Sequence, residues 1–433
     1  MRKVTLITLA ALAAAAVACG RTGLLVDDDA LGGGPGGSSS SGGVSDGGAF
    51  EGAADANPDV LDPEGNPPTV DIGGKAVPNV QQIVAGDGHA CLRDKKSRVF
   101  CWGVNAYGEL GNGTTVLSYT AARVPGLPGI VRLAAGQHHT CALGVDQSVW
   151  CWGGAADGQL GGGFSDDFVP TPQKVALASP PVAIAAAGWH TCVTDAEGKL
   201  TCWGRNTSGE CGVVGVDRLL SPTPVTGIGS GLGAIAAGTW HTCAVVPDGT
   251  VRCFGRNSDG QLGMGSDGQF EATPQVVFNV TGATFLMAGD DHTCALTTSG
   301  TMWCWGDGFL GELGDGVGQG SPSPVPVPNA VGVVHAAGGL EHTCAVLKNG
   351  HAQCWGKGLQ GQLGNNDFPL MTKVPVDVQG VTDAVQVTAG SEFTCIAHAT
   401  RGAQCWGASD NGELGHGQGD AEFQATPVEV LGL

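Results

Sequence analysis

The sequence predicts an all-β protein folded as a seven-bladed β-propeller. One phrase, HTCALTTSGTMWCWG at 292–306, recurs nearly unchanged in four further copies and more loosely at 89–103 and 393–407, which makes seven copies at intervals of 50 or 51 residues. Each copy carries two cysteines ten positions apart, with a turn sequence between them. A fixed period near 50 residues, with about four strand-like runs in each unit, is typical of a repeat array in which every unit is one small sheet. The 75 glycines among 433 residues fit the many tight turns of such an array.

The elements of one unit can be followed from about residue 235 onward. AIAAG is a short inner run, HTCAVV an apolar strand, PDG a turn, TVRCFG the returning strand, SDGQLG a glycine loop and ATPQVV a last strand. Alternation places the residue two before the second cysteine on the face of that cysteine. That residue is apolar in all copies: Val99, Val149, Leu200, Val251, Met302, Ala352 and Ala403. A large aromatic follows the cysteine and should fill the opposite face: Trp102, Trp152, Trp203, Phe254, Trp305, Trp355 and Trp406.

The end of the chain favours a closed ring over an open solenoid. The chain stops at Leu433, about 13 residues before an eighth first cysteine would be due, and residues 78–90 are of that length. We therefore expect the C-terminal strand TPVEVLGL to complete the first blade, so that strands from both ends share one blade. A ring closed in this way has no free sheet edge.

The N-terminal part predicts export. Residues 1–19 combine a positive start with a run of fifteen apolar residues, too short for a membrane span and typical of a signal peptide. The end of the run resembles a bacterial lipobox, which predicts lipidation of Cys19 and, with Gly20 following, an outer-membrane or cell-surface location. The alternative is ordinary cleavage beside an incidental cysteine, giving a secreted or periplasmic soluble protein. Residues 20–77 are rich in Gly, Ser, Asp and Pro and should form a disordered tether. The propeller is expected over 78–433.

Two segments carry a family resemblance: AGQHHTCALGVDQSVWCWGGAADGQLG at 135–161 and AGTWHTCAVVPDGTVRCFGRNSDGQLG at 237–263. Their pattern resembles the regulator of chromosome condensation repeat family, over roughly residues 78–433. The resemblance implies a seven-bladed propeller closed by strands from both ends. Among the activities known in that family are nucleotide exchange on a GTPase, photoreception and inhibition of β-lactamases. The chain departs from the pattern in its paired cysteines and in Cys211, which replaces the leucine of one G-x-L-G.

The cysteine pairs predict disulfides. Residues ten apart across a hairpin can lie directly opposite each other, and export to an oxidising compartment favours the bond. The expected pairs are Cys91 with Cys101, Cys141 with Cys151, Cys192 with Cys202, Cys243 with Cys253, Cys294 with Cys304, Cys344 with Cys354, and Cys395 with Cys405. A metal site at His292, Cys294 and Cys304 is the alternative, but it offers only three ligands and the seventh copy has Phe393 in place of the histidine. No metal is therefore predicted, and Cys211 is expected to be a small buried hydrophobe.

Charge and motifs restrict the function. The formal net charge of −20 repels phosphate backbones, so nucleic acid is not expected as a partner. The chain shows no G-x-S-x-G, H-E-x-x-H, P-loop or dinucleotide motif, so we predict no catalytic residue and no cofactor. Carboxylates are abundant, which leaves a glycosidase or lyase as an alternative.

The variable segments between each G-x-L-G and the next proline should lie on one face of the ring, where binding loops gather. Four of them place an acid near a phenylalanine, and these are the candidate partner-binding residues: Asp167, Phe168, Asp267, Phe270, Asp367, Phe368, Asp420 and Phe423. Alternatively, each phenylalanine pins its own loop while the acid caps a turn. Trp189 and Trp240 could likewise be exposed contacts or could pack against the next blade.

The sequence thus predicts a monomeric, non-catalytic, envelope-anchored propeller that binds a protein or glycan through its loop face. It would meet the membrane only through its N-terminal lipid. The alternatives are an inhibitor of a secreted enzyme and, third, a polysaccharide-acting enzyme.

Overall fold

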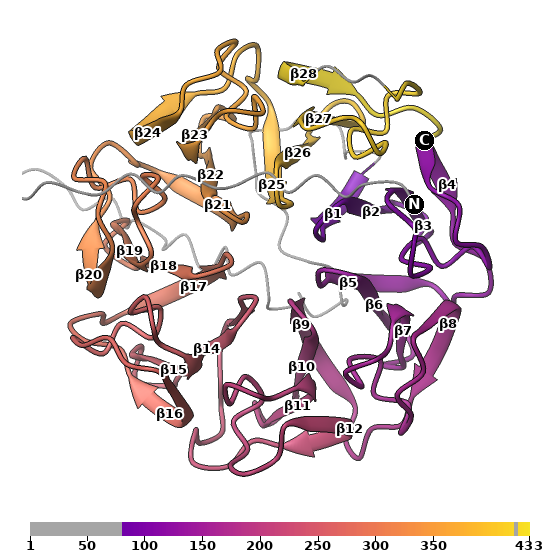
Figure 1. Cartoon of the computed structure of the whole chain (residues 1–433), viewed down its shortest axis with the longest axis vertical. Helices are drawn as coiled ribbons and strands as arrows, with labels where there is room; N and C mark the ends of the chain where they lie inside the picture. The colour runs from indigo at the N-terminus through magenta and orange to yellow at the C-terminus, as the bar shows by residue number, and fades with distance from the viewer. Residues whose placement is uncertain (1–79, 420–422) are drawn as a thin grey trace, which may run out of the picture. The chain divides into compact units, whose positions relative to one another are not determined.

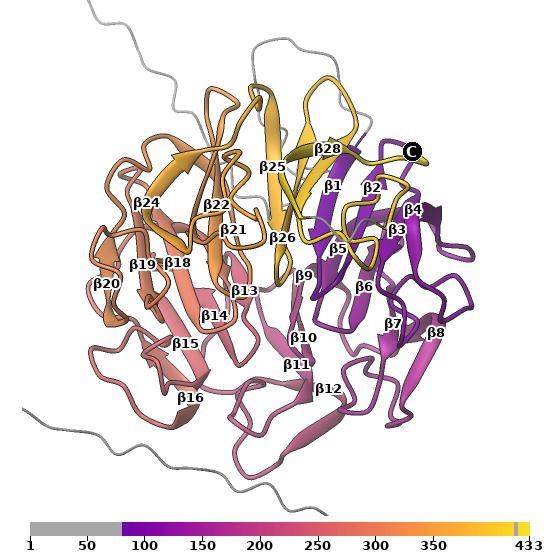
Figure 2. The same ribbon diagram turned by 45° about the horizontal axis from the view of Figure 1, so that its top comes forward.

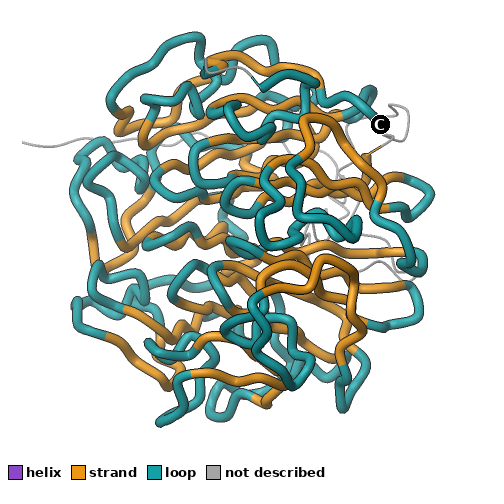
Figure 3. Tube along the Cα trace, turned by 45° about the vertical axis from the view of Figure 1, so that its right-hand side comes forward, coloured by secondary structure: helices purple, strands orange, loops and turns teal. Residues whose placement is uncertain are grey.

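The computed structural model describes residues 80–419 and 423–433 and shows seven four-stranded antiparallel sheets arranged as blades around an axis (Figure 1). The described residues contain strands and loops and no helix (Figure 3). The prediction of an all-β seven-bladed propeller is confirmed. Residues 1–79, which include Cys19 and the segments predicted to be a signal peptide and a tether, lie outside the described residues, as does Asp420.

Each blade is built from four consecutive strands, from the innermost to the outermost. Blades 1 and 2 contain β1 (Val80–Ala85), β2 (His89–Asp94), β3 (Val99–Gly103), β4 (Ser118–Arg123), β5 (Ile130–Ala135), β6 (His139–Gly144), β7 (Val149–Gly154) and β8 (Phe168–Val175). Blades 3 and 4 contain β9 (Pro181–Ala187), β10 (His190–Asp195), β11 (Leu200–Arg205), β12 (Arg218–Pro224), β13 (Ile235–Ala237), β14 (His241–Val245), β15 (Val251–Arg256) and β16 (Phe270–Val276). Blades 5 to 7 contain β17 (Ala283–Ala288), β18 (His292–Thr297), β19 (Met302–Gly306), β20 (Ser321–Pro326), β21 (Val333–Gly338), β22 (His342–Leu347), β23 (Ala352–Lys357), β24 (Met371–Asp377), β25 (Ala384–Ala389), β26 (Phe393–His398), β27 (Ala403–Gly407) and β28 (Gln424–Glu429).

The expected sharing of one blade by the two ends is wrong. Strand β28 pairs with β27 in blade 7, and β1 pairs with β2 in blade 1, so every blade is one continuous segment of chain. Counting from the first cysteines could not distinguish a chain that ends inside a blade from one that ends between blades. The C-terminal segment still contacts blade 1, because the Ala121 amide in β4 donates to the Leu431 carbonyl over 2.9 Å, but no described strand is shared between blades 7 and 1.

Alternation along the second and third strands places the repeat residues as the sequence predicts. Paired cysteines lie directly opposite each other, and in blade 5 Cys294 faces Cys304. The seven apolar residues two before the second cysteines are all buried, and the seven aromatics that follow those cysteines have no exposed surface. Hydrophobic clusters join neighbouring blades; one cluster contains Ala90 and Trp102 of blade 1 together with Phe393 of blade 7.

A polar latch joins neighbouring blades at six of the seven junctions. Between blades 5 and 6, for example, His292 Nε2 lies 2.8 Å from Thr343 Oγ1, and that hydroxyl donates to the Glu312 carbonyl over 2.9 Å. Since the hydroxyl donates to the carbonyl, it accepts from the imidazole. The six histidines are His89, His139, His190, His241, His292 and His342. Where blade 7 meets blade 1, Phe393 replaces the histidine and Ala90 replaces the threonine.

The buried tryptophans form a second inter-blade contact. Each indole N–H donates to a carbonyl in the G-x-L-G segment of the preceding blade, as Trp152 does to Glu109 over 2.7 Å. The glycine ending that segment sits against the ring: Gly111 has φ +63°, and a Cβ there would lie 2.7 Å from Trp152 Nε1. Glycine is required at this position because a side chain would meet both strained backbone and the indole.

The strand directions define two faces of the ring (Figure 2). The loop face carries the turns from first to second strands and the loops from third to fourth strands, with the adjoining halves of the strands. The opposite face carries the turns from second to third strands and the connections between blades. Val80 begins β1 at the opposite face, so the described chain enters the propeller there. Among residues 80–419 and 423–433, we find no helical segment with the length and apolarity needed to traverse a bilayer.

Candidate binding face

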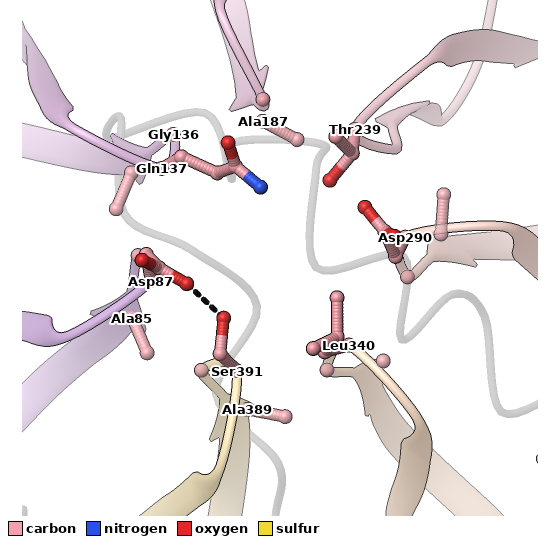
Figure 4. Close-up of a pocket in the computed structure, with 18 residues that line it drawn as sticks. Ala85, Asp87, Gly136, Gln137, Ala187, Thr239, Asp290, Leu340, Ala389 and Ser391 are labelled. Carbon is pink, nitrogen blue, oxygen red and sulfur yellow. Dashed lines mark hydrogen bonds between the residues drawn. The ribbon is translucent and has the colours of Figure 1, made fainter. Parts of the chain in front are cut away.

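The axis of the ring opens on the loop face as a cavity of about 70 Å³ (Figure 4). The turns from first to second strands of all seven blades line it, and we call this cavity the channel mouth. Backbone hydrogen bonds link successive turns around it: the Asp87 amide donates to Gln137 O over 3.2 Å, and the Ser391 amide donates to Asp87 O over 3.1 Å. The second of these bonds crosses from blade 7 to blade 1, so the rim of the channel mouth is continuous there.

Two carboxylates from distant parts of the sequence reach the channel mouth. Asp87 accepts a hydrogen bond from the Ser391 hydroxyl, and Asp290 lies beside Thr239 (Figure 4). The Oδ1 atom of Asp290 is buried and has no hydrogen-bond partner among the described residues. Burial raises the pKa of Asp290 above its usual value, because removing the ionised form from water is costly.

Around blades 3 and 4 the loop face carries a cluster of tryptophan and arginine side chains. The rings of Trp189 and Trp240 lie 5.2 Å apart between centroids at 56°, and the Arg205 guanidinium lies 4.7 and 4.3 Å from them. Arg256 also lies over the Trp240 ring, at 5.6 Å. Both tryptophans remain partly exposed. The sequence left open whether they are exposed contacts or packed against the next blade; in the structure they pack on each other and on arginine while keeping accessible surface.

Around blades 5 to 7 the loop face is acidic. Arg256 bridges Asp291 at 3.4 Å and Asp259 at 3.2 Å. Lys357 bridges Glu341 at 2.6 Å and Glu392 at 3.2 Å. Burial, followed by the neighbouring Asp290, raises the pKa of Asp291 to about 7. Each of these two cations is therefore already shared between two carboxylates.

Seven buried Glu and Gln side chains support the loops behind this face. They alternate along the sequence at the position before the leucine of each G-x-L-G, or before Cys211 where it replaces that leucine: Glu109, Gln159, Glu210, Gln261, Glu312, Gln362 and Glu413. A side-chain oxygen of each accepts a backbone N–H from its own turn, as Glu109 Oε2 does from Tyr107 over 2.8 Å. Burial raises the pKa of Glu312 to about 7. Amide and carboxyl serve this turn equally, which explains why either residue is found there.

Charge is divided unequally between the two faces. The described carboxyl residues in loop-face segments are Asp87, Glu109, Asp157, Asp166, Asp167, Glu210, Asp217, Asp259, Asp267, Glu271, Asp290, Asp291, Asp307, Glu312, Asp315, Glu341, Asp367, Glu392, Asp410 and Glu413. The loop-face cations are Arg205, Arg218, Arg256, Lys357 and Lys373. On the opposite face the acids are Asp94, Asp146, Asp195, Glu197, Asp248, Asp377, Asp383 and Glu429. The cations there outnumber them: Arg93, Lys95, Lys96, Arg98, Arg123, Arg132, Lys174, Lys199, Arg252, Lys348 and Arg401.

Exposed aromatic side chains follow the same division. Most of those that the structure describes lie in loop-face segments: Tyr107, Tyr119, Phe168, Phe270, Phe309, Phe368 and Phe423. Phe309 is 69% exposed, the largest fraction among them. Phe278 is the exposed aromatic outside that group and lies in a connection between blades. Exposed aromatics gathered on one face are typical of a protein interface.

The structure places the predicted rim residues apart from one another. Phe168, Phe270, Phe368 and Phe423 belong to blades 2, 4, 6 and 7, and between 40% and 50% of the surface of each is exposed. Asp167, Asp267 and Asp367 precede three of them and are also exposed. These phenylalanines are therefore not buried under their loops. Their role in binding a partner stays a prediction.

All seven predicted cysteine pairs are disulfides in the structure, with Cα atoms 4.0 to 4.1 Å apart. Cys211 is a buried free thiol that packs in the core. The His292 imidazole, considered above as a metal ligand, instead bonds Thr343. Among the described residues, no group of three or more His, Cys, Asp and Glu side chains is arranged to hold a metal ion.

Sequence reasoning missed the channel mouth and the Trp189, Arg205 and Trp240 stack as sites. One signal could have found the first. The position two before each repeat histidine, or before Phe393 in the last copy, varies while its surroundings repeat, reading Asp87, Gln137, Gly188, Thr239, Asp290, Leu340 and Ser391. Variation at one position of a regular repeat indicates residues that the fold does not dictate.

Comparisons with known proteins agree with this architecture. A family model described as an RCC1-like domain matches residues 8–328, and models of the regulator of chromosome condensation (RCC1) repeat match 333–362 and 349–397. The solved structure of Prp20p from Saccharomyces cerevisiae, described with its binding to Gsp1p and histones, is 25% identical, with a TM-score of 0.66 over 77% of this chain and 84% of that one.

Curated relatives match over shorter stretches. The human probable E3 ubiquitin-protein ligase HERC4 is 28% identical over 56% of this chain and 19% of its own length. The ultraviolet-B receptor UVR8 of Arabidopsis thaliana is 34% identical over 31% of each chain. The chain thus spans well under half the length of these relatives. The RCC1-like domain model covers more than half of the chain, and the chain repeats the same four-stranded blade throughout its described residues. This protein therefore belongs to the RCC1-like propeller family.

Proposed function

We propose that this protein is a non-catalytic, envelope-anchored propeller that binds a protein partner through its loop face. The observation that carries the proposal is the gathering of exposed aromatics and charge on that face. Aromatic and arginine side chains provide most of the energy of protein interfaces, and Trp189, Arg205 and Trp240 supply both kinds in one cluster. The similarity to Prp20p, whose solved structure is described with its binding to Gsp1p and histones, supports a protein partner.

The relatives do not bring an activity with them. HERC4 is named as a ubiquitin ligase, but this chain spans only 19% of it, so that name carries no ligase function here. The buried glutamates behind the face have structural tasks, since they hold their turns through backbone N–H groups. A binding function uses the face as it stands and requires no reacting group.

Anchoring through Cys19 is the second part of the proposal. Its support is the export sequence and the seven disulfides, which suit an oxidising compartment. Labelling of growing cells with a palmitate analogue should mark the wild type and leave Cys19→Ser unmarked. Equal labelling of both proteins would contradict the anchor.

Site-directed photo-crosslinking tests the binding face. A photoreactive phenylalanine analogue is placed at position 309 on the loop face or, as a control of similar exposure (62%), at position 145 in an opposite-face turn. We expect position 309 to capture one partner and position 145 to capture none. The partner is then purified, and its dissociation constant is measured by calorimetry against Trp240→Ala and Val145→Ala. We expect Trp240→Ala to weaken binding about 30-fold, as loss of an interface anchor does, and Val145→Ala to leave it unchanged.

Two results would overturn the proposal. Capture at position 145 alone would move the interface to the opposite face. Turnover of a polysaccharide by the purified protein would show that it is an enzyme. A secreted enzyme as the captured partner would identify the protein as an inhibitor, which is a binding function at the same face.

A further inference from the structure

The loop face holds negative charge that its own cations do not neutralise. Arg256 is committed to Asp259 and Asp291, and Lys357 to Glu341 and Glu392. Asp87 and Asp290, which reach the channel mouth, form no salt bridge with any described residue. Asp87 and Asp290 add to this excess of unpaired carboxyls and bring it to the point where the seven blades meet.

The channel mouth has a shape and chemistry suited to one cationic side chain. Its cavity of about 70 Å³ is larger than one water molecule requires and is lined by acceptor oxygens of Asp87, Asp290, Thr239 and Ser391. Asp290 Oδ1 is buried without a hydrogen-bond partner in the described part of the chain. A buried carboxylate oxygen left without a donor is costly, and an ammonium or guanidinium group would satisfy it.

A second carboxyl group with one unpartnered oxygen, that of Glu109, lies near Asp87. The Glu109 side chain is 1% exposed, and its Oε1 has no hydrogen bond among the described residues; the nearest cation-forming atom is His138 Nδ1 at 3.8 Å. Burial, with a smaller contribution from Asp87, raises the pKa of Glu109, so the two carboxyls are close enough to interact. The Tyr107 ring stacks on His138 with centroids 4.8 Å apart and remains 42% exposed. An acidic side chain and an aromatic contact thus adjoin the channel mouth at blades 1 and 2.

We propose that the loop face receives a basic polypeptide segment, one of whose lysine or arginine side chains enters the channel mouth between Asp87 and Asp290. This inference rests on the proposed function, because it names the kind of partner that the same face binds. Charge complementarity carries it: carboxyls surround the channel mouth on several blades, whereas the opposite face has a surplus of cations. A polypeptide fits better than a small amine, because exposed aromatics such as Phe270 on blade 4 and Phe309 on blade 5 lie on the same face but not in the lining of the mouth.

The test measures binding of a fluorescent eight-residue lysine peptide to the full chain by anisotropy at 50 and 300 mM salt, with an eight-residue glutamate peptide as probe control. The site variant is Asp87→Asn with Asp290→Asn, which removes charge and keeps size. The matched control is Asp146→Asn with Asp248→Asn, which removes the same charge from opposite-face turns. We expect at least a tenfold weaker affinity for the site variant at 50 mM salt, a change below twofold for the control, and weaker wild-type binding at 300 mM salt.

Three outcomes would overturn the inference: no binding of the lysine peptide to the wild type, equal weakening in both double variants, or equal binding of the glutamate peptide. Concentration-dependent sedimentation showing that two copies associate through the loop face would also overturn it, since the occupant would then be a second copy. Failure of the inference is distinguishable from failure of the proposed function. If the photo-crosslinked partner binds Asp87→Asn with Asp290→Asn normally but is lost with Trp240→Ala, the binding face stands and the basic occupant does not.

Discussion

The six latched junctions between blades and the junction where blade 7 meets blade 1 solve the same packing problem differently. At the six, a buried histidine bonds a threonine of the next blade. At the seventh, Phe393 is 1% exposed and packs with Ala90 in one apolar cluster. Both partners of the polar pair are replaced together, so no donor or acceptor is left unpaired. The difference indicates that the histidine and the threonine of a latch depend on each other, so that one is replaced only together with the other. It also shows that the ring tolerates an apolar contact in place of the hydrogen bond at one junction.

Disulfide reduction should have the largest effect on stability. Every blade contains one bridge, so reduction weakens the blades at the six latched junctions and at the seventh junction alike. Closing a loop of this length stabilises a fold by roughly 2.5 kcal/mol, so loss of seven bridges exceeds the roughly 5–15 kcal/mol stability of an ordinary domain. We expect the reduced protein to unfold at all junctions together. Intact mass should rise by two hydrogens for each of the seven bridges, and circular dichroism should show loss of the sheets. A reduced protein that keeps its melting temperature would contradict this.

Acid should weaken the six latched junctions next. Burial lowers the pKa of His89 and His139 to about 3 and that of His292 to about 4, and the other three latch histidines behave alike. Since the folded pKa lies below the ordinary 6.5, the contribution to stability is complete above pH 6.5 and is lost as pH falls toward the folded value. Each histidine loses about 1.4 kcal/mol per pH unit in that window.

Buried carboxyls oppose this trend: burial raises the pKa of Asp291 and Glu312 most, and it raises the pKa of four others in the same direction, Glu109, Glu210, Asp290 and Glu413. The pKa values of Asp291 and Glu312 are raised to about 7, so their contribution is complete below the ordinary pKa and is lost as pH rises toward 7. The six latch histidines outnumber the two carboxyls with this large shift, and urea unfolding without reductant should show stability falling from pH 6.5 to pH 5. Unchanged stability across that range would show that the histidines are not buried as neutral groups.

Breaking a single latch should cost less. Thr293→Val keeps the side-chain shape but removes one hydrogen-bond partner each from His241 Nε2 and the Gln261 carbonyl. We expect the free energy of unfolding, measured with urea at pH 7.5, to fall by about 2–3 kcal/mol. Thr293→Ser retains the hydroxyl and serves as the control, with a smaller loss. Equal losses in the two variants would indicate that packing of the methyl group, and not the hydrogen bond, is what matters.

Installing a latch at the seventh junction should give the smallest effect. Phe393→His and Ala90→Thr should each destabilise the ring alone, because each buries an unpaired polar group. The double variant should recover about 1–2 kcal/mol of coupling energy in a double-mutant cycle. A coupling energy near zero would show that the backbone at this junction does not allow the hydrogen bond.

The sequence predicted the blades because their signal is local and repeated. A hairpin such as 292–306 contains its own turn, its own cysteine pair and its own alternation of buried residues. The ring closure was missed because it depends on which strand begins a blade, and seven repeats of nearly equal length contain no information about that starting point. Only the pairing of β28 with β27 decides it.

The site was predicted in outline and missed in detail. Exposed phenylalanines such as Phe168 and Phe270 follow a visible pattern in the variable loops, and the structure leaves them accessible. The channel mouth is assembled from single residues of separate repeats, such as Asp87 and Asp290, which have no neighbouring motif. Their meeting follows from the geometry of the ring, which sequence spacing alone does not reveal.

Because the loop face has an excess of acids and the opposite face an excess of bases, the propeller has a permanent electric dipole along its axis. The negative end of this dipole lies at the loop face. Above an anionic bilayer, such a dipole would turn the side bearing Lys95, Lys96 and Lys348 toward the lipid. The described chain also enters the ring on that side, at Val80. The dipole and the position of Val80 would then both favour an orientation with the opposite face toward the lipid. In that orientation the exposed aromatics of the loop face point away from the membrane.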